Sequence, residues 1–260
     1  MSYRPTKQMT VCVLILSAMC FTGCATVKQT ADPIFEVHQA SSMTLDGKLD
    51  EPAWQKATFV TLTGYVPQKP KLNQIENLVH GAFLWDDKGL YVGMEIEDED
   101  IQANKTQKND WIWLEDAFEL FLAKRRTIDC PHLELQVNPA GVCYEELMQG
   151  STIMSVSSIK TPDNMPRYQV ATHVQGSIND SKNKDERWSV EWFIPWDQLR
   201  QKQMLVQDTQ IKPGRVVCYA RLANWNISIY SYFRVMRYLK PGTHNPHDVA
   251  TYRPLMLMKQ

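Results

Sequence analysis

Short segments in which apolar and polar residues alternate, separated by turn signals, make up most of this 260-residue chain. The clearest are Leu90–Ile96, Ala117–Leu122 and Trp188–Ile194. A period of two is typical of strands that bury one face. About ten or more such segments occur, whereas the only helical signals are single turns at Glu51–Trp54 and Trp196–Leu199. The sequence therefore predicts an all-β chain that forms a single β-sandwich or jelly-roll-like domain with short helical turns.

The first 23 residues do not follow this pattern. Arg4 and Lys7 precede an apolar run of eleven residues, Val11–Phe21. This run is too short to cross about 30 Å of hydrocarbon as a helix, but it is typical of a signal peptide. The segment F-T-G-C that ends at Cys24 resembles a bacterial lipoprotein signal, which implies cleavage before Cys24 and lipidation of its thiol. An ordinary secretory signal cut nearby is the alternative.

This interpretation divides the chain into a signal peptide at 1–23, a tether at 24–35 and a β-sandwich domain at 36–260. Two or three acyl chains anchor a protein stably, because each buried CH₂ contributes about 0.8 kcal/mol. We therefore expect a lipid-anchored protein of a bacterial cell envelope, at the outer membrane or the cell surface. Its contact with the membrane is expected through the lipid anchor only.

Charge and cysteine content narrow the possible partners. Without Arg4 and Lys7 the chain has 26 basic and 29 acidic residues, and no basic run is interleaved with aromatic residues. Nothing in this distribution favours a nucleic acid as partner.

Beyond Cys24, the cysteines are Cys130, Cys143 and Cys218, without the spacing of a zinc site. At most one disulfide can form among these three, and the sequence does not select the pair.

Asp110–Leu122 joins a loop to a strand. The loop carries Trp111 and Trp113, and the strand places Glu119 on the face opposite Phe118. A carboxylate in the middle of a strand is costly to bury unless a partner pairs with it. The pattern indicates a tryptophan-bearing loop beside a deliberately placed acid. The alternative is two core tryptophans and a solvated glutamate on an edge strand.

An acidic run, Glu97–Asp100, follows one of the predicted strands. Asp98 and Asp100 offer the carboxylate oxygens that calcium prefers. The run lacks the glycine and the spacing of an EF-hand loop, so a solvated loop without an ion is the alternative.

Five motifs occur in order over most of Met43–Met258. They are D-G-K-L-D-E-P-A-W-x-x-A at Asp46–Ala57, L-Y-V-G-x-x-I-x-D at Leu90–Asp98, W-x-x-D-A-F-E-L-F at Trp113–Phe121, L-x-V-N-P-x-G at Leu135–Gly141 and W-S-V-E-W-F-I-P-W at Trp188–Trp196. Together they resemble the family 9 carbohydrate-binding modules. The resemblance implies a β-sandwich that binds a poly- or oligosaccharide, often holds structural calcium, and is not catalytic.

The resemblance also implies a sugar pocket clamped by two aromatic side chains. Trp113 matches the first, and the second would fall near His244, where this chain has no tryptophan. Trp111 and His244 are therefore the further aromatic candidates for the pocket. The polar contacts of the family fall on positions that match Glu119, Gln136, Asn138 and Arg221.

The strand patterns agree with this assignment. Gln136 and Asn138 alternate with Leu135, and Arg221 alternates with Leu222, so the polar side chains lie opposite the apolar ones. A pyranose needs a flat aromatic surface for its C–H face, and fixed donors and acceptors for its hydroxyls. A structural ion pair between Arg221 and Glu119 is the alternative.

Two other function classes remain open. Related sandwiches bind haem through Met, His or Lys ligands, and this chain has twelve Met and six His, but no spacing selects a pair. A glycosidase needs two carboxylates about 5–9 Å apart, and Glu119, Glu134 and Glu191 are available. The nucleophile motif G-x-S-x-G is absent from the sequence.

The other tryptophans of the motifs are expected in the core: Trp54, Trp188, Trp192 and Trp196.

Overall fold

The computed structural model describes residues 34–65, 79–150, 157–159, 168–228, 233–238 and 245–259. The chain separates into two units, Met1–Ala31 and Asp32–Gln260, and only the second is described here. The predicted signal peptide, Cys24 and His244 lie outside the described residues. Within the described part, no helix combines the length and the apolar character needed to cross a membrane.

The regular secondary structure of the Asp32–Gln260 unit is almost entirely β-strand, and the strands form one curled sheet with two halves. The first half contains β5 (Ala117–Ala123), β6 (His132–Val137), β7 (Cys143–Gln149), β8 (Ser157–Ile159), β11 (Val216–Ser228), β12 (Phe233–Tyr238) and β13 (Arg253–Leu257). The second half contains β2 (Val60–Tyr65), β3 (Val79–Trp85), β4 (Gly89–Glu97), β9 (Gln169–Gln175) and β10 (Arg187–Pro195). The strand order is β8-β7-β6-β5-β11-β12-β2-β3-β4-β10-β9.

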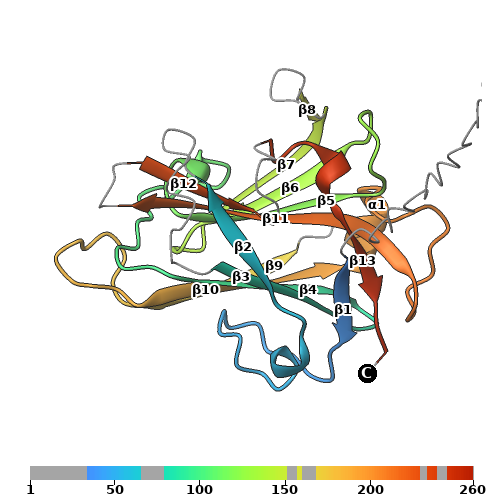
Figure 1. Cartoon of the computed structure of the whole chain (residues 1–260), viewed down its shortest axis with the longest axis horizontal. Coiled ribbons are helices and arrows are strands. Elements are labelled where there is room, and N and C mark those ends of the chain that lie inside the picture. Colours follow the sequence, from blue (N-terminus) through green and yellow to red (C-terminus); the bar gives the residue numbers. More distant parts are fainter. Residues whose placement is uncertain are drawn as a thin grey trace, which may run out of the picture. The chain divides into compact units, whose positions relative to one another are not determined.

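Two connections join the halves into a sandwich. The antiparallel pair of β12 and β2 links them, and β2 can be followed from one layer to the other in Figure 1. At a second connection, β1 (Phe35–Gln39) pairs in parallel with both β13 and β3. Phe35, at the end of the predicted tether, is 2% exposed and already belongs to the folded core.

The core lies between the two halves and follows from the period-two pattern. Phe118, Leu120 and Leu122 of β5 are buried against Trp188 and its apolar neighbours on β10. The rings of Phe118 and Trp188 lie 4.1 Å apart, centroid to centroid. The expected all-β sandwich is thus confirmed. The four tryptophans assigned to the core are indeed buried: Trp54, Trp188, Trp192 and Trp196.

Among the described residues, helical structure is limited to short turns, as predicted. They are η1 (Trp54–Lys56), η3 (Ile112–Leu114), η4 (Val249–Thr251) and the six-residue α1 (Trp196–Gln201). All three described cysteines are free, so none of the pairs left open by the sequence forms in this structure.

The segment before η1 packs on the outer face of the second half. Its anchor is Glu191 of β10, which is fully buried and accepts hydrogen bonds from the indole N–H of Trp54 (2.8 Å) and the backbone N–H groups of Gly47 (2.9 Å) and Asp46 (3.0 Å). Burial raises the pKa of Glu191 above its ordinary value. Asp-Gly is a common hairpin dipeptide, but Asp46-Gly47 does not join two strands here, because the chain between β1 and β2 contains no other strand.

Gly47 is required at that turn for two reasons. Its φ is +87°, in the region that favours glycine. A Cβ atom added there would also lie 2.4 Å from the backbone of Thr172. Two of the sequence motifs therefore contact each other in the fold. The segment D-G-K-L-D-E-P-A-W packs against the strand that contains W-S-V-E-W, with Glu191 at the centre of the contact.

Candidate functional site

The four strands β7-β6-β5-β11 carry polar side chains on the face opposite the core. Glu119 of β5 pairs with Gln136 of β6, which in turn pairs with Tyr144 of β7. Because directly paired residues share a face, these side chains form one row across the sheet. We call the following set the polar face: Glu119, Glu134, Gln136, Tyr144, Glu146, Arg221 and Trp225.

Glu119 is 2% exposed and has a tryptophan partner. Its Oε1 accepts a hydrogen bond from the indole Nε1 of Trp225 on β11, at 2.9 Å. This indole N–H offsets part of the cost of burying the carboxylate in mid-strand. The strand pattern therefore predicted the position of Glu119 well, but it did not identify Trp225, which brings a further aromatic ring to the polar face.

Gln136 and Glu134 form the buried centre of the polar face. The side-chain Nε2 of Gln136 donates to Oε1 of Glu134 at 2.5 Å. The Oε1 of Gln136 is buried and has no hydrogen-bond partner among the described residues. A buried acceptor without a partner is costly, so a ligand hydroxyl that donates to this oxygen would be favoured.

Aromatic rings stand at one edge of the polar face. The rings of Trp111 and Trp113 are nearly parallel, with an interplanar angle of 25° and centroids 5.9 Å apart. Trp113 also contacts the ring of Tyr144 edge-on, at 5.1 Å. Trp111 is 62% exposed, and Trp113 is half-buried, so neither is a core residue. Together they form an accessible apolar surface next to the row of polar side chains.

Asn138 has a structural role that its sequence position did not reveal. It is fully buried; its Nδ2 donates to the carbonyl of Lys105 and to Glu115, and its Oδ1 accepts from the N–H of Val142. These bonds hold the turn between β6 and β7 against the segment that leads into η3. Asn138 thereby positions the tryptophan loop, and its direct contact with a ligand stays a prediction.

Arg221 also serves the fold. Its guanidinium donates to the carbonyl of Asn245 (3.2 Å) and to the hydroxyl of Thr251 (2.7 Å), and the residue is 4% exposed. It thereby ties β11 to η4, whereas Glu119 binds Trp225. The alternative of a structural ion pair between Arg221 and Glu119 stays a prediction.

Two histidines lie at the other end of the polar face. His132 and His247 are hydrogen-bonded through their ring nitrogens at 3.1 Å, and Nδ1 of His247 lies 3.9 Å from Oε2 of Glu134. Burial lowers the pKa of His132 to about 3 and that of His247 to about 4. Both rings are therefore neutral at neutral pH, so one can donate its proton to the other.

The pKa of Glu134 leads to a pH prediction. Burial raises this pKa from 4.5 to about 7. Between these values the folded protein keeps a proton that the unfolded chain releases, so this group lowers the free energy of unfolding as the pH rises from 4.5 to 7. Glu134→Gln should remove that contribution. The difference in urea midpoint between wild type and variant should change over this pH range, and a constant difference would contradict the assignment.

The acidic run provides a donor set that fits calcium, with one change from the expectation. Asp98 and Asp116 are both buried, and the Nδ2 of Asn226 donates to both carboxylates, at 2.7 and 3.2 Å. Two buried carboxylates that share one amide repel each other, and a cation would offset that repulsion. If the Asn226 amide turned by half a rotation, three oxygens would converge and supply part of the set of about six to eight oxygens that calcium takes. Asp100 instead accepts from the side chain of Gln102 at 2.8 Å.

The three carboxylates considered for a hydrolase do not all lie on one face. Glu119 and Glu134 lie on the polar face, but Glu191 lies on the outer face of the other half, bound to Trp54 and Gly47. Glu191 is therefore a structural acid.

A β-sandwich that sets accessible tryptophans beside a polar sheet face has the architecture of a binding module. The chain belongs to the carbohydrate family 9 binding domain-like family, whose sequence pattern matches residues 45–210. The resemblance seen in the five sequence motifs is thereby confirmed.

Solved structures share the fold. A family 9 carbohydrate-binding module from Caldicellulosiruptor kristjanssonii in complex with cellotriose is 14% identical, with a TM-score of 0.53 over 86% of this chain and 94% of that one. The same kind of module from this organism in complex with glucose gives 12% identity and a TM-score of 0.54, over 86% and 96% of the chains. A protein from Bacteroides uniformis gives 13% and 0.56, over 86% and 98%. At these identities the likeness shows the fold. No curated protein sequence matched the chain.

Proposed function

We propose that this chain binds a poly- or oligosaccharide without catalysis, at the polar face beside Trp111 and Trp113. The observation that carries the proposal is the pair of near-parallel, accessible indoles at the edge of a row that contains the unpartnered acceptor of Gln136. A pyranose ring stacks on such a surface through its C–H face while its hydroxyls meet Glu119 and Gln136. Family membership and the sugar complexes of the structural relatives support this proposal.

A glycan array probed with the soluble form lacking residues 1–24 tests the proposal. We expect binding to a restricted set of neutral oligosaccharides, and no cleavage products after prolonged incubation. Absence of binding to every glycan would contradict it. An absorption spectrum of the same preparation distinguishes the haem-binding alternative, because a haem protein absorbs strongly in the visible range.

The proposed setting is the bacterial cell envelope, with Cys24 as the lipidated residue. Its support is the apolar run Val11–Phe21 followed by Cys24. Cys24→Ser is expected to release the protein from the membrane fraction or to leave it unprocessed. Fractionation and gel migration in a bacterial host provide the measurement. Identical behaviour of mutant and wild type would contradict the lipid anchor.

Calcium is proposed as a structural ion held by Asp98, Asp116 and Asn226. An ion that binds only the folded state raises stability by RT ln(1 + [L]/Kd). Chelation with EDTA should therefore lower the melting temperature, and calcium should restore it. The effect should disappear in Asp116→Asn and persist in the control Asp50→Asn, which alters a separate surface group of acids. A wild-type melting temperature that does not change on addition of EDTA would exclude the ion.

A further inference from the structure

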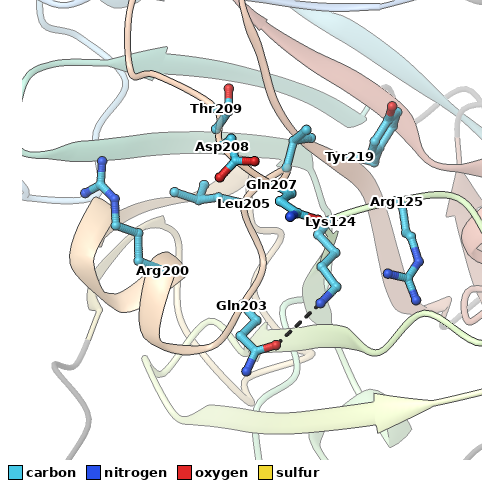
Figure 2. A pocket seen from close by; sticks show the side chains of 10 residues that line it. Lys124, Arg125, Arg200, Gln203, Leu205, Gln207, Asp208, Thr209 and Tyr219 are labelled. Carbon is cyan, nitrogen blue, oxygen red and sulfur yellow. Dashed lines mark hydrogen bonds between the residues drawn. The ribbon is translucent and has the colours of Figure 1, made fainter.

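A second concave site lies at the opposite end of β5 from the tryptophan loop. It is a cleft of about 710 Å³ between the residues that follow β5, the end of α1 with its following loop, and β11. Figure 2 shows its principal side chains: Lys124, Arg125, Arg200, Gln203, Asp208 and Tyr219. A volume of this size accommodates a ligand of one or two sugar rings.

The charge of the cleft is predominantly positive. Lys124, Arg125 and Arg200 line it against one acid, Asp208. Arg125 has an ion pair with Asp129, and Arg200 one with Asp197, both at 3.2 Å. Since both pairs are about half-exposed or more, they contribute little energy, and the guanidinium groups can turn to a ligand. Lys124 reaches the side-chain oxygen of Gln203 through a long hydrogen bond of 3.4 Å.

The wall of the cleft is preformed. Gln203 and Asp208 have φ angles of 56° and 55°, in the left-handed region that non-glycine residues seldom adopt. Hydrogen bonds hold the loop in this conformation: the N–H of Met204 donates to Leu199, and the N–H of Val206 donates to Val217 of β11. Strained residues held by surrounding structure occur most often at ligand sites. The backbone of this loop therefore does not need to reorganise to receive a ligand.

We propose that this cleft binds the anionic group of an acidic sugar, a carboxylate or a sulfate. Arginine presents paired N–H groups that match the oxygens of such anions. Gln203, Gln207 and Thr209 provide amides and a hydroxyl for the sugar hydroxyls. The cleft is separate from the surface formed by Trp111 and Trp113, because β5, which lies between them, has seven residues and spans about 20 Å. The choice of a sugar rather than another anion rests on the proposed function.

The test uses the soluble form lacking residues 1–24 with two probes, trigalacturonic acid and a sulfated chondroitin disaccharide. Calorimetry at low salt should detect binding of at least one of them. For trigalacturonic acid, the fully methyl-esterified trimer is the neutral control. The affinity for the binding probe should fall about tenfold or more in Lys124→Gln/Arg125→Gln/Arg200→Gln, because hydrogen bonds between charged groups are lost. It should also weaken as salt is added.

A matched triple variant removes the same charge elsewhere. Lys48→Gln/Lys184→Gln/Arg187→Gln alters three exposed cations outside the cleft and should leave the affinity within about twofold, as should Trp113→Ala. Equal losses in both triple variants would overturn the proposal, as would binding of neither probe. Binding to phosphatidylcholine vesicles containing phosphatidylglycerol, but to neither probe, would assign the cleft to lipid headgroups instead. Absence of binding to every neutral glycan, together with cleft-dependent binding of an acidic probe, would overturn the proposed polar-face function alone.

Discussion

Glu191→Ala is expected to lower the free energy of unfolding by about 3–5 kcal/mol, which is a large fraction of the stability of an ordinary domain. The fully buried carboxylate accepts hydrogen bonds from Trp54, Gly47 and Asp46. Its removal leaves an indole N–H and two backbone N–H groups without acceptors, and it also creates a cavity. Urea or guanidinium unfolding followed by tryptophan fluorescence measures the loss.

Two further variants show whether the loss of stability comes from the hydrogen bonds that Glu191 accepts. Glu191→Gln keeps one acceptor oxygen and should lose less than the alanine variant. Glu95→Ala removes a half-exposed acid from β4 and should cost well under about 1 kcal/mol. An alanine variant as stable as the wild type would show that the Asp46–Trp54 segment is not anchored by Glu191.

Trp113→Ala is expected to weaken oligosaccharide binding by about 1–3 kcal/mol, which is roughly a tenfold to hundredfold loss of affinity. The indole is half-buried and contacts only the rings of Trp111 and Tyr144 among the described aromatic residues, so its removal should change stability much less than removal of a core tryptophan. Calorimetric titration and the urea midpoint should be measured on the same preparations. Large destabilisation with unchanged affinity would return Trp113 to the core.

The companion variants separate stacking from polar contacts. Glu119→Gln retains an oxygen that can accept from Trp225, so the fold should persist while a charged acceptor for sugar hydroxyls is lost. Leu114→Ala is the control, because Leu114 lies in η3 beside Trp113 and is 40% exposed. It should alter neither affinity nor stability appreciably.

The sequence was informative wherever one strand face is uniformly apolar. The alternation in Leu90–Ile96 and Trp188–Ile194 located β4 and β10, because both strands pack one face into the central core. It did not locate β12, Phe233–Tyr238, because the sequence F-R-V-M-R-Y does not alternate between apolar and polar residues. Nor did it locate β1. This strand has only five residues, which is too short for a clear alternation, and it forms by pairing with β13 and β3, which are distant in sequence.

In the candidate site, too, local strand patterns predicted some residues, whereas contacts between residues distant in sequence were not predicted. Strand alternation and family resemblance placed Glu119 and Gln136 on one face, because register follows from a period of two. The role of Asn138 depends on Lys105 and Glu115, to which no local pattern connects it. Trp225 was missed although the alternation of β11 continues through it, since Arg221, Ala223 and Trp225 share a face.

The most direct test of the polar face as a sugar site is the indole N–H region of a ¹⁵N-NMR spectrum during titration with an oligosaccharide selected on the glycan array. The chain has eight tryptophans, and single Trp→Phe variants assign their resonances. We predict that the signals of Trp111, Trp113 and Trp225 shift with one common affinity, while those of the buried Trp54, Trp188 and Trp192 remain in place. Saturable binding that moves none of the first three signals would contradict the account.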